Sequence, residues 1–395
     1  MFFKKVPLKS LYATSYKRKA CHQLQNFFNM VDYKECITFC RIIMNEEKYC
    51  HALVSSELRA RGFYRKLLAE GKSWEEIFYM VKTGESQRIA PRLQWNVICP
   101  KLEKLDVEKH FEILQPRGVK LLLGDSLPEG LRNTSDAPVF LYARGNIEVL
   151  FHKTIGLVGA RSMSSHAKEV LHSIVPRCVE LGLSIVSGLA QGVDVMAHEI
   201  CLKYGGTAIA VLGCGVTECY PMANQKCYDK ILERGGCIVS EYPPGYPPSD
   251  YTFPERNRII AGLSQALCVV QASLKSGSLI TASEALEQGK NIYVVPGLFG
   301  DERFAGSNRL IRDGAYILSD VESFNQYFDG LPSPPTAMVF QSVEEEVVWK
   351  LLADPKTLDD LMGTSGVSFS VLGQMLFRWE IDGKVVQEGG RYRKI

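Results

Sequence analysis

Apolar runs return at nearly even spacing between residues 154 and 320, and a helix-like segment follows each run. The runs consist of valine, isoleucine and leucine without polar alternation, which is typical of strands that are covered on both faces of a parallel sheet. The six runs are TIGLVG (154–159), LSIVSG (183–188), TAIAVLG (207–213), CIVSEY (237–242), ALCVVQA (266–272) and NIYVVPG (291–297). This alternation predicts a Rossmann-like α/β fold with a parallel sheet core, whose functional residues lie in the loops after the strands.

The segment before this core has a different pattern. VKLLLGD (119–125) and PVFLYARG (138–145) predict two more strands, which we expect at the edge of the sheet. Residues 1–110 carry helical spacing and few strand signals, so we expect a small helical N-terminal domain there. Ser73 precedes Trp74 and two glutamates, and its hydroxyl is expected to cap a helix that starts at Trp74.

A proline-rich segment predicts a second domain boundary. GLPSPPT (330–336) has three prolines in seven residues and little to bury, which indicates a linker over residues 330–340. It separates an extended Rossmann-like domain, residues 111–329, from residues 341–395, where three helices and a hairpin predict a C-terminal winged helix. Residues 341–395 hold seven Lys and Arg against nine Asp and Glu, and the third helix offers only Arg378. We therefore expect a partner-binding or packing module, since helices that read a DNA groove are basic.

Composition narrows the class of protein. With 46% hydrophobic and 23% charged residues, the chain of 395 residues has the balance of a soluble protein, and its apolar runs are too short for a membrane-spanning helix. Twelve cysteines without a CxxC pair predict reduced thiols in the cytoplasm and no zinc site. The net charge is only +2, so any contact with nucleic acid must come from a local patch. The basic residues 1–19 lack the apolar core of a secretory signal, and we expect a short tethered arm or a transit-like leader.

The first two turns of the core offer phosphate chemistry. The turn after residue 159 lacks the GxGxxG fingerprint, which argues against a dinucleotide cofactor, but it carries Arg161 and Ser162. The planar guanidinium of an arginine can hold a phosphate at two points. The next turn begins with Ser187 and Gly188, small residues that leave backbone N–H groups free for an anion.

Asp194 and His198 follow that second turn, one helical turn apart. Their spacing is compatible with acid–base catalysis, but the sequence pairs no nucleophile with them. We therefore favour a structural hydrogen bond.

The loop over residues 242–264 is the most unusual in the chain. Five prolines in thirteen residues stiffen it, and it ends in Arg256, Asn257 and Arg258 at the start of a helix. Cations beside aromatic rings suit single-stranded nucleic acid, and Tyr251 or Phe253 is a candidate to stack on a base. The alternative is a rigid, packed excursion with surface arginines.

The loop after residue 272 combines a lysine, hydroxyl groups and a glycine at a helix start. Its residues are Lys275, Ser276, Gly277 and Ser278, followed by Thr281. They suit a phosphate, although GxxxxGK[ST] is absent and the loop is not a Walker motif. Several phosphate-binding loops on one sheet edge, without an organised catalytic set, favour a binding protein over an enzyme.

Taken together, these loops resemble the DNA-processing protein A family, also called DprA or Smf. The resemblance covers about residues 115–320 and is carried by eight motifs in order. They are GLVGAR (156–161), SGLAQGVDVMAH (187–198), AVLGCGVTECYPMAN (210–224), SEYPPG (240–245), FPERNRIIAGLS (253–264), KSGSLITASEALEQGK (275–290), VPG (295–297) and GSNRLIRDGA (306–315).

The resemblance implies a cytoplasmic homodimer that binds single-stranded DNA without sequence preference. Family members protect incoming DNA in natural transformation and help load RecA recombinase, with no nucleotide or metal. By position, the phosphate-binding residues are Arg161, Arg256, Arg258 and Lys275, within a site that adds Ser162, Ser187, Gly188, Asn257, Ser276, Gly277, Ser278 and Thr281. The alternative is a nucleotide-binding Rossmann-like enzyme of the phosphoribohydrolase type, for which Glu284 is the only candidate acid.

Four positions depart from the family pattern. Ala160 replaces a usual serine, Gln191 a common arginine, Glu255 a common basic residue and Gln271 a usual glutamate. Since the second and third changes remove positive charge beside the expected groove, we expect a flatter salt dependence of DNA binding.

Overall fold

The computed structural model describes residues 46–56, 60–328, 345, 348–349, 351–352, 355–381 and 385–394. The chain divides into two compact units, residues 1–334 and 335–395. The predicted N-terminal arm and the proline-rich linker lie outside the described residues. No helix within the described ranges is long and apolar enough to cross a membrane, and no cluster of His, Cys, Asp or Glu there could hold a metal ion.

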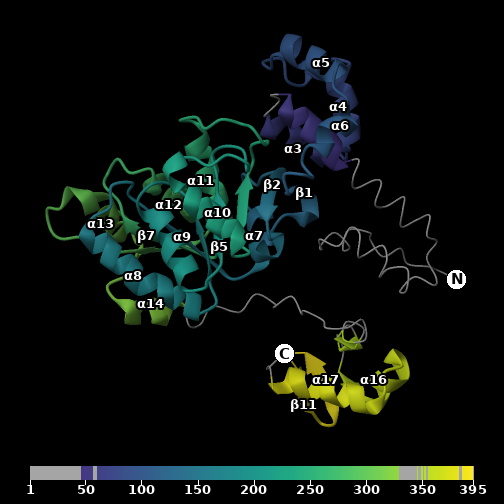
Figure 1. The fold of residues 1–395 in the computed structure, drawn as a ribbon, viewed down its shortest axis with the longest axis vertical. Coiled ribbons are helices and arrows are strands. Elements are labelled where there is room, and N and C mark those ends of the chain that lie inside the picture. The colour runs from purple at the N-terminus through teal and green to yellow at the C-terminus, as the bar shows by residue number, and fades with distance from the viewer. Residues whose placement is uncertain are drawn as a thin grey trace. The chain divides into compact units, whose positions relative to one another are not determined.

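Within the described residues, nine strands form the main sheet, in the order β1-β2-β6-β5-β4-β3-β7-β8-β9. They are β1 (Val119–Leu123), β2 (Phe140–Gly145), β3 (Thr154–Gly159), β4 (Ser184–Ser187), β5 (Ala208–Val211), β6 (Cys237–Ser240), β7 (Ala266–Gln271), β8 (Asn291–Val294) and β9 (Tyr316–Ile317). The six predicted core strands, β3 to β8, are parallel, and the predicted Rossmann-like class is confirmed. β1 and β2 extend one edge as predicted, but they run antiparallel (Figure 1).

Helices cover both faces of this sheet and make two apolar cores. α8 (Ser165–Glu180), α9 (Val193–Lys203) and α10 (Gln225–Glu233) cover one face, and α11 (Thr252–Leu263) and α12 (Ser278–Glu287) cover the other. In β3, Ile155 and Leu157 pack into the first core while Val158 packs into the second. This alternation follows from the period of two along a strand, and it explains why the strand sequences show no polar face. α13 (Ala305–Arg312) and α14 (Val321–Phe328) complete this part of the fold.

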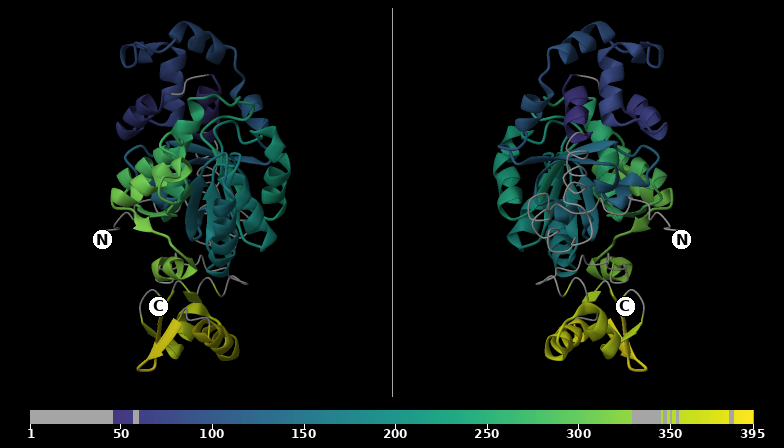
Figure 2. Two further views of the ribbon diagram at one scale, coloured as in Figure 1. Left: turned by 90° about the vertical axis from the view of Figure 1, so that its left-hand side faces the viewer. Right: turned by 90° about the vertical axis from the view of Figure 1, so that its right-hand side faces the viewer.

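The N-terminal helices pack at the β1–β2 edge of the sheet (Figures 1 and 2). They include α3 (Arg61–Ala69), α4 (Trp74–Lys82), α5 (Trp95–Glu103) and α6 (Val107–Glu112), and α7 (Glu129–Arg132) follows β1. α4 begins as predicted, because the Ser73 hydroxyl accepts from the backbone N–H of Glu76 at 3.1 Å. Trp74 is buried against Tyr64 of α3 and Phe140 of β2, so it joins the helices to the sheet.

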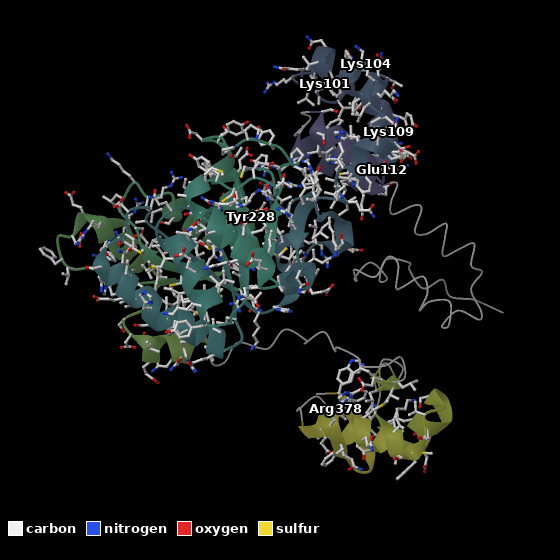
Figure 3. The ribbon with its side chains drawn as sticks, viewed as in Figure 1. Lys101, Lys104, Lys109, Glu112, Tyr228 and Arg378 are labelled. Atoms are coloured by element: carbon white, nitrogen blue, oxygen red, sulfur yellow. The ribbon has the colours of Figure 1, made fainter. Side chains whose placement is uncertain are left out.

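The C-terminal unit has its own small core. It contains β10 (Lys356–Thr357), α16 (Leu358–Ser365), α17 (Phe369–Ile381), β11 (Val385–Glu388) and β12 (Arg391–Lys394). The hairpin turns at Gly389 and Gly390, both with positive φ, as the sequence predicts. Arg378, labelled in Figure 3, pairs with Glu345 of the same unit. The basic side chain expected on the third helix therefore serves packing inside this unit.

Candidate nucleic-acid interface

The candidate site lies where the strand order reverses. From β3 the chain adds β4, β5 and β6 on one side and then returns to place β7 on the other side of β3. The loops after β3, β4 and β7 therefore meet at the carboxyl edge of the sheet. In open α/β sheets this switch point is where ligands bind.

The turns after β3 and β4 form one packed unit. The backbone N–H of Val193 donates to the carbonyl of Ala160 at 3.2 Å. Gly192 has a φ of +87°, and a Cβ atom there would overlap the carbonyl groups of Ala160 and Arg161. Only glycine fits this close approach. The turn after β3 is also held from β7, since Gln271 Oε1 accepts from the backbone N–H of Ser164 at 2.9 Å.

Arg161 and Ser162 are exposed at the top of this unit. The guanidinium carbon of Arg161 lies 5.8 Å from the ring centroid of Phe253, in a cation–π arrangement. The structure thus brings the arginine of the first turn beside an aromatic residue of the proline-rich loop. Tyr251 and Phe253 were predicted as candidates to stack on a base, and Phe253 is the one that pairs with Arg161.

Arg256 does not face solvent. Its side chain is only 5% exposed, and it donates to the carbonyl oxygens of Gly188, at 2.8 Å, and of Val211. These carbonyl groups stand at the carboxyl ends of β4 and β5, where the strand ladder leaves them without partners. Arg256 therefore satisfies two strand-end carbonyl groups inside the protein, whereas the sequence predicted that it binds a phosphate.

Arg258 is also internal. Its guanidinium, on a residue 4% exposed, pairs with Glu241 and lies 3.0 Å from Asp136 Oδ2. Arg61 of α3 joins the same cluster, with Nη1 3.2 Å from Glu241 Oε2. The cluster links the N-terminal helices to α11. Asn257, the residue between the two arginines in the sequence, is also buried. The prediction that these residues face DNA fails in this structure because carboxylates from distant segments hold Arg258 inside.

The turn after β4 satisfies its own polar groups. The Ser187 hydroxyl donates to the carbonyl of Leu157 at 2.6 Å, and the Gly188 N–H donates to Asp194 at 3.1 Å. Burial raises the pKa of Asp194 to about 6, against the opposing effect of Arg256. Burial also lowers the pKa of His198 to about 4. Asp194 makes a structural hydrogen bond, but its donor is the Gly188 backbone and not His198.

The turn after β7 does reach solvent. Lys275 and Gly277 are exposed, while Ser278 and Thr281 are buried in the first turn of α12. The hydroxyls of Ser276 and Ser278 lie 2.7 Å apart. Lys275 and the start of α12 thus place positive charge on the carboxyl edge of the strand next to β3.

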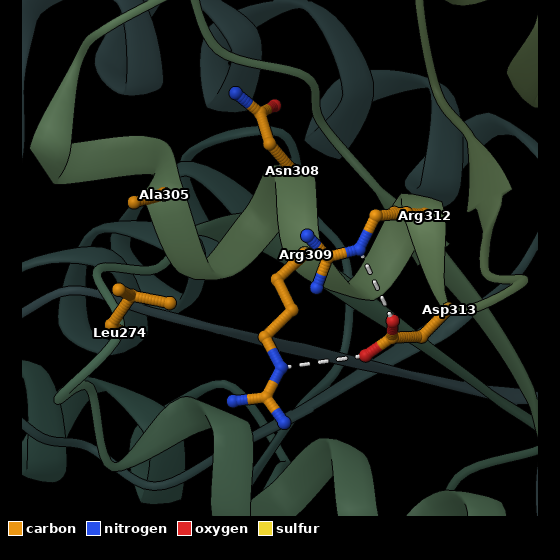
Figure 4. Close-up of a pocket in the computed structure, with 6 residues that line it drawn as sticks. All are labelled: Leu274, Ala305, Asn308, Arg309, Arg312 and Asp313. Atoms are coloured by element: carbon orange, nitrogen blue, oxygen red, sulfur yellow. Dashed lines mark ion pairs between the residues drawn. The ribbon is translucent and has the colours of Figure 1, made fainter.

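An open depression lies beside this turn, and Figure 4 shows its lining. Arg309 Nε lies 3.4 Å from Asp313, and Arg312 Nε lies 3.6 Å from the same carboxylate. The two arginines share this one carboxylate, so Asp313 offsets only part of their positive charge. Because Arg161 and Lys275 lie at the switch point instead, we centre the candidate site on them.

Glu284, the acid of the alternative enzymatic interpretation, lies in the middle of α12 and is half-buried. Burial and Glu287 raise its pKa, while Arg258 and Arg61 oppose the shift. The charged groups that shift the pKa of Glu284 thus include Arg61 and Arg258 of the internal ion cluster. The geometry does not connect Glu284 with the exposed turn at Lys275.

The sequence profile of the family described as DNA recombination-mediator protein A matches residues 120–329. The chain belongs to this family. It is 37% identical over 224 residues to Protein Smf of Escherichia coli (strain K12), a match that covers 56% of this chain and 60% of that protein, which is less than two thirds. It is 39% identical over 198 residues to DNA processing protein DprA of Streptococcus pneumoniae, covering 50% of this chain and 70% of that protein.

A solved structure of a DprA protein also matches this chain. The X-ray structure of DNA processing protein A from Streptococcus pneumoniae superposes with a TM-score of 0.62 at 31% identity, and it covers 71% of this chain and 98% of that chain. The predicted resemblance to the DprA/Smf family is confirmed.

Two features of the site were not predicted from the sequence. Asp136, which pairs with Arg258, and Arg61, which pairs with Glu241 in the same cluster, come from segments outside every motif, and no sequence signal links them to α11. Tyr220 lies within one of the eight motifs but was not predicted as a site residue, and its ring lies 5.4 Å from that of Phe253. The signal that could have identified it is an aromatic residue in a loop at a strand end.

Proposed function

We propose that this protein binds single-stranded DNA without sequence preference. The observation that carries the proposal is the cation–π pair of exposed Arg161 and half-buried Phe253 at the switch point, with exposed Lys275 on the neighbouring turn. A single strand needs charge for its phosphates and π surfaces for its bases, and this edge supplies both. No feature of the pair selects one base over another.

The candidate residues divide into two groups by burial. Those that contact DNA in this proposal are exposed or half-buried. They are Arg161, Ser162, Lys275, Ser276 and Gly277. The others act through the protein by fixing the turns, and they are Ser187, Gly188, Arg256, Asn257, Arg258, Ser278 and Thr281.

In the cell, we propose that the protein acts in the cytoplasm on incoming DNA in natural transformation. There it protects the strand and helps to load RecA recombinase onto it. The family's description as a recombination mediator supports this role, since a mediator must hold a single strand before a recombinase does.

We further propose that a second copy of the chain covers the β9 edge of the sheet. Tyr316 and Ile317 of β9 are 46% and 47% exposed. Among the strands that the structure describes, β9 is the last of the sheet, and an apolar edge strand favours association. A homodimer would place two sites on one strand of DNA and raise avidity without new contacts.

A fluorescence-anisotropy titration with labelled oligo-dT and its duplex, at two salt concentrations, tests the DNA-binding proposal. Arg161→Ala should weaken binding to the single strand by about 1–3 kcal/mol, as expected for a charged hydrogen bond. It should also flatten the salt slope by about 0.7, the value for one lost phosphate contact. The control is Arg234→Ala, because Arg234 is an exposed cation at the end of α10, on the opposite edge of the sheet.

Two results would contradict the proposal. Wild-type protein that fails to bind oligo-dT at low salt would refute single-strand binding itself. Equal affinities of wild type and Arg161→Ala would refute the placement of the site.

A further inference from the structure

We propose that Tyr220 and Phe253 form a platform of two rings on which successive bases of the strand stack. The proposal rests on single-strand binding at Arg161. Tyr220 is 45% exposed, and its ring centroid lies 5.4 Å from that of Phe253, with an angle of 33° between the ring planes. Phe253 is therefore in contact with Arg161 and with Tyr220, so one cation and two aromatic rings lie in a continuous group.

The backbone that carries Tyr220 is held firmly by the surrounding fold. The Asn224 side chain donates to the carbonyl of Leu189 at 2.9 Å, and its backbone N–H donates to the carbonyl of Pro221 at 2.9 Å. The hydroxyl of Tyr228, labelled in Figure 3, donates to the carbonyl of Val216 in the same loop. A ring on such a loop loses little conformational freedom on binding, and preorganisation of this kind raises affinity.

The backbone of Leu189, whose carbonyl group accepts the hydrogen bond from Asn224, is strained. It has a φ of +52°, and it is the only residue other than glycine with positive φ in the described part of the chain. Such backbone strain is concentrated at functional sites and persists only where the surroundings fix it. Here the strained turn after β4 presents the Leu189 carbonyl to Asn224 and so joins this turn to the loop of Tyr220.

The positions of the cations and rings define the path of the bound strand across the sheet edge. Lys275 follows β7, Arg161 follows β3, and Tyr220 lies in the loop after β5. In the order β5-β4-β3-β7, the strands that these residues follow span three strand spacings, about 14 Å along the carboxyl edge. The strand therefore runs from the lysine past the arginine to the two rings, and Tyr220 contacts a base while Arg161 contacts a phosphate.

Anisotropy titrations with Tyr220→Ala and Tyr220→Phe separate base stacking from phosphate binding. Tyr220→Ala should lower affinity for oligo-dT about 5- to 100-fold, as expected for one lost stacking contact, with an unchanged salt slope. Tyr220→Phe should bind like wild type, because the ring remains. The matched control is Tyr204→Ala, since Tyr204 is 51% exposed beside Lys203 but ends α9 at the amino edge of the sheet.

An oligonucleotide of the same length without bases completes the test. It retains the phosphates, so wild type and Tyr220→Ala should bind it equally. In Tyr220→Trp, the added indole fluorescence should be quenched when oligo-dT binds. This second variant keeps an aromatic ring and gives a signal even if the alanine variant folds poorly.

The outcomes distinguish this inference from the function on which it rests. If wild type binds oligo-dT but Tyr220→Ala binds equally well, or the indole is not quenched on binding, the platform is refuted while single-strand binding stands. If Tyr220→Ala flattens the salt slope as Arg161→Ala does, the ring acts through the phosphate site and the platform is also refuted. If wild type does not bind at all, single-strand binding fails first.

Discussion

The guanidinium of Arg256 fills the space that a side chain at Gly188 would occupy. A Cβ atom at Gly188 would overlap both terminal nitrogens of this guanidinium. Arg256 Nη1 donates to the Gly188 carbonyl at 2.8 Å, so the arginine can approach only because residue 188 has no side chain. Two motifs that are 68 positions apart in the sequence therefore depend on each other for packing.

Gly188→Ala should lower the free energy of unfolding by about 1–3 kcal/mol. The added methyl group would displace Arg256, and overpacking of a buried site has a cost of this order. Urea denaturation measures the change. The control is Gly277→Ala, because Gly277 has open space around it and an ordinary φ of −62°. Equal stability of Gly188→Ala and wild type would show that Arg256 moves aside freely.

The sequence predicted the elements of this fold better than the directions of its side chains. Apolar runs without a polar face predicted the parallel strands, because both faces of the sheet are covered. The same sequence placed Arg256 and Arg258 in a DNA groove, since an arginine after aromatic residues suits a phosphate. Their true direction depends on Asp136, Glu241 and strand-end carbonyls, which adjoin them only after folding.

Glu241→Ala should lower the free energy of unfolding by about 3–5 kcal/mol, because it leaves the buried guanidinium of Arg258 without its nearest carboxylate. Glu241 and Arg258 side chains are only 7% and 4% exposed. Asp125→Ala is the control, since it breaks an exposed pair with Arg132 and should change stability by less than about 1 kcal/mol. Thermal and urea unfolding would check both variants. Similar small losses in the two variants would contradict a stabilising role for the buried cluster.

Acid should destabilise the junction between the N-terminal helices and β2. His51 Nδ1 lies 2.8 Å from the Tyr142 hydroxyl, and its ring stacks on His110 at 4.6 Å. Burial and the neighbouring His110 lower the pKa of His51 to about 3. Below its ordinary pKa of about 6.5, the unfolded chain binds a proton that the folded chain excludes, so stability falls as the pH drops from about 6.5 towards 3.

His51→Gln tests that pH dependence. The amide preserves a hydrogen bond to Tyr142 but does not titrate, so the variant should lose less stability on acidification. The slope should be shallower by up to about 1.4 kcal/mol per pH unit, the value for one proton. Urea denaturation at several pH values between 7.5 and 4.5 measures it. Parallel pH profiles of variant and wild type would exclude His51 as the titrating group.

Ile317→Glu should convert the proposed homodimer into a monomer. Ile317 lies on β9, the last strand of the sheet, and nearly half of its surface is exposed. A carboxylate there would have to lose its water to be buried against a second copy, and an unpaired buried charge is strongly unfavourable. Light scattering coupled to size-exclusion chromatography would show the change in mass. The control is Ile113→Glu, because Ile113 is similarly exposed but ends α6 in the helical region.

The same variant should separate avidity from contact at the DNA site. Because β8 separates Ile317 on β9 from the strand that precedes Lys275, the monomer should bind a strand that is long enough for only one site as well as wild type does. Binding to a longer strand should weaken, since the second site no longer adds to the first. Anisotropy titrations with short and long oligo-dT measure both effects. An unchanged mass of Ile317→Glu would refute the β9 edge as the interface, and equal weakening on both strands would show that the substitution disturbs the site itself.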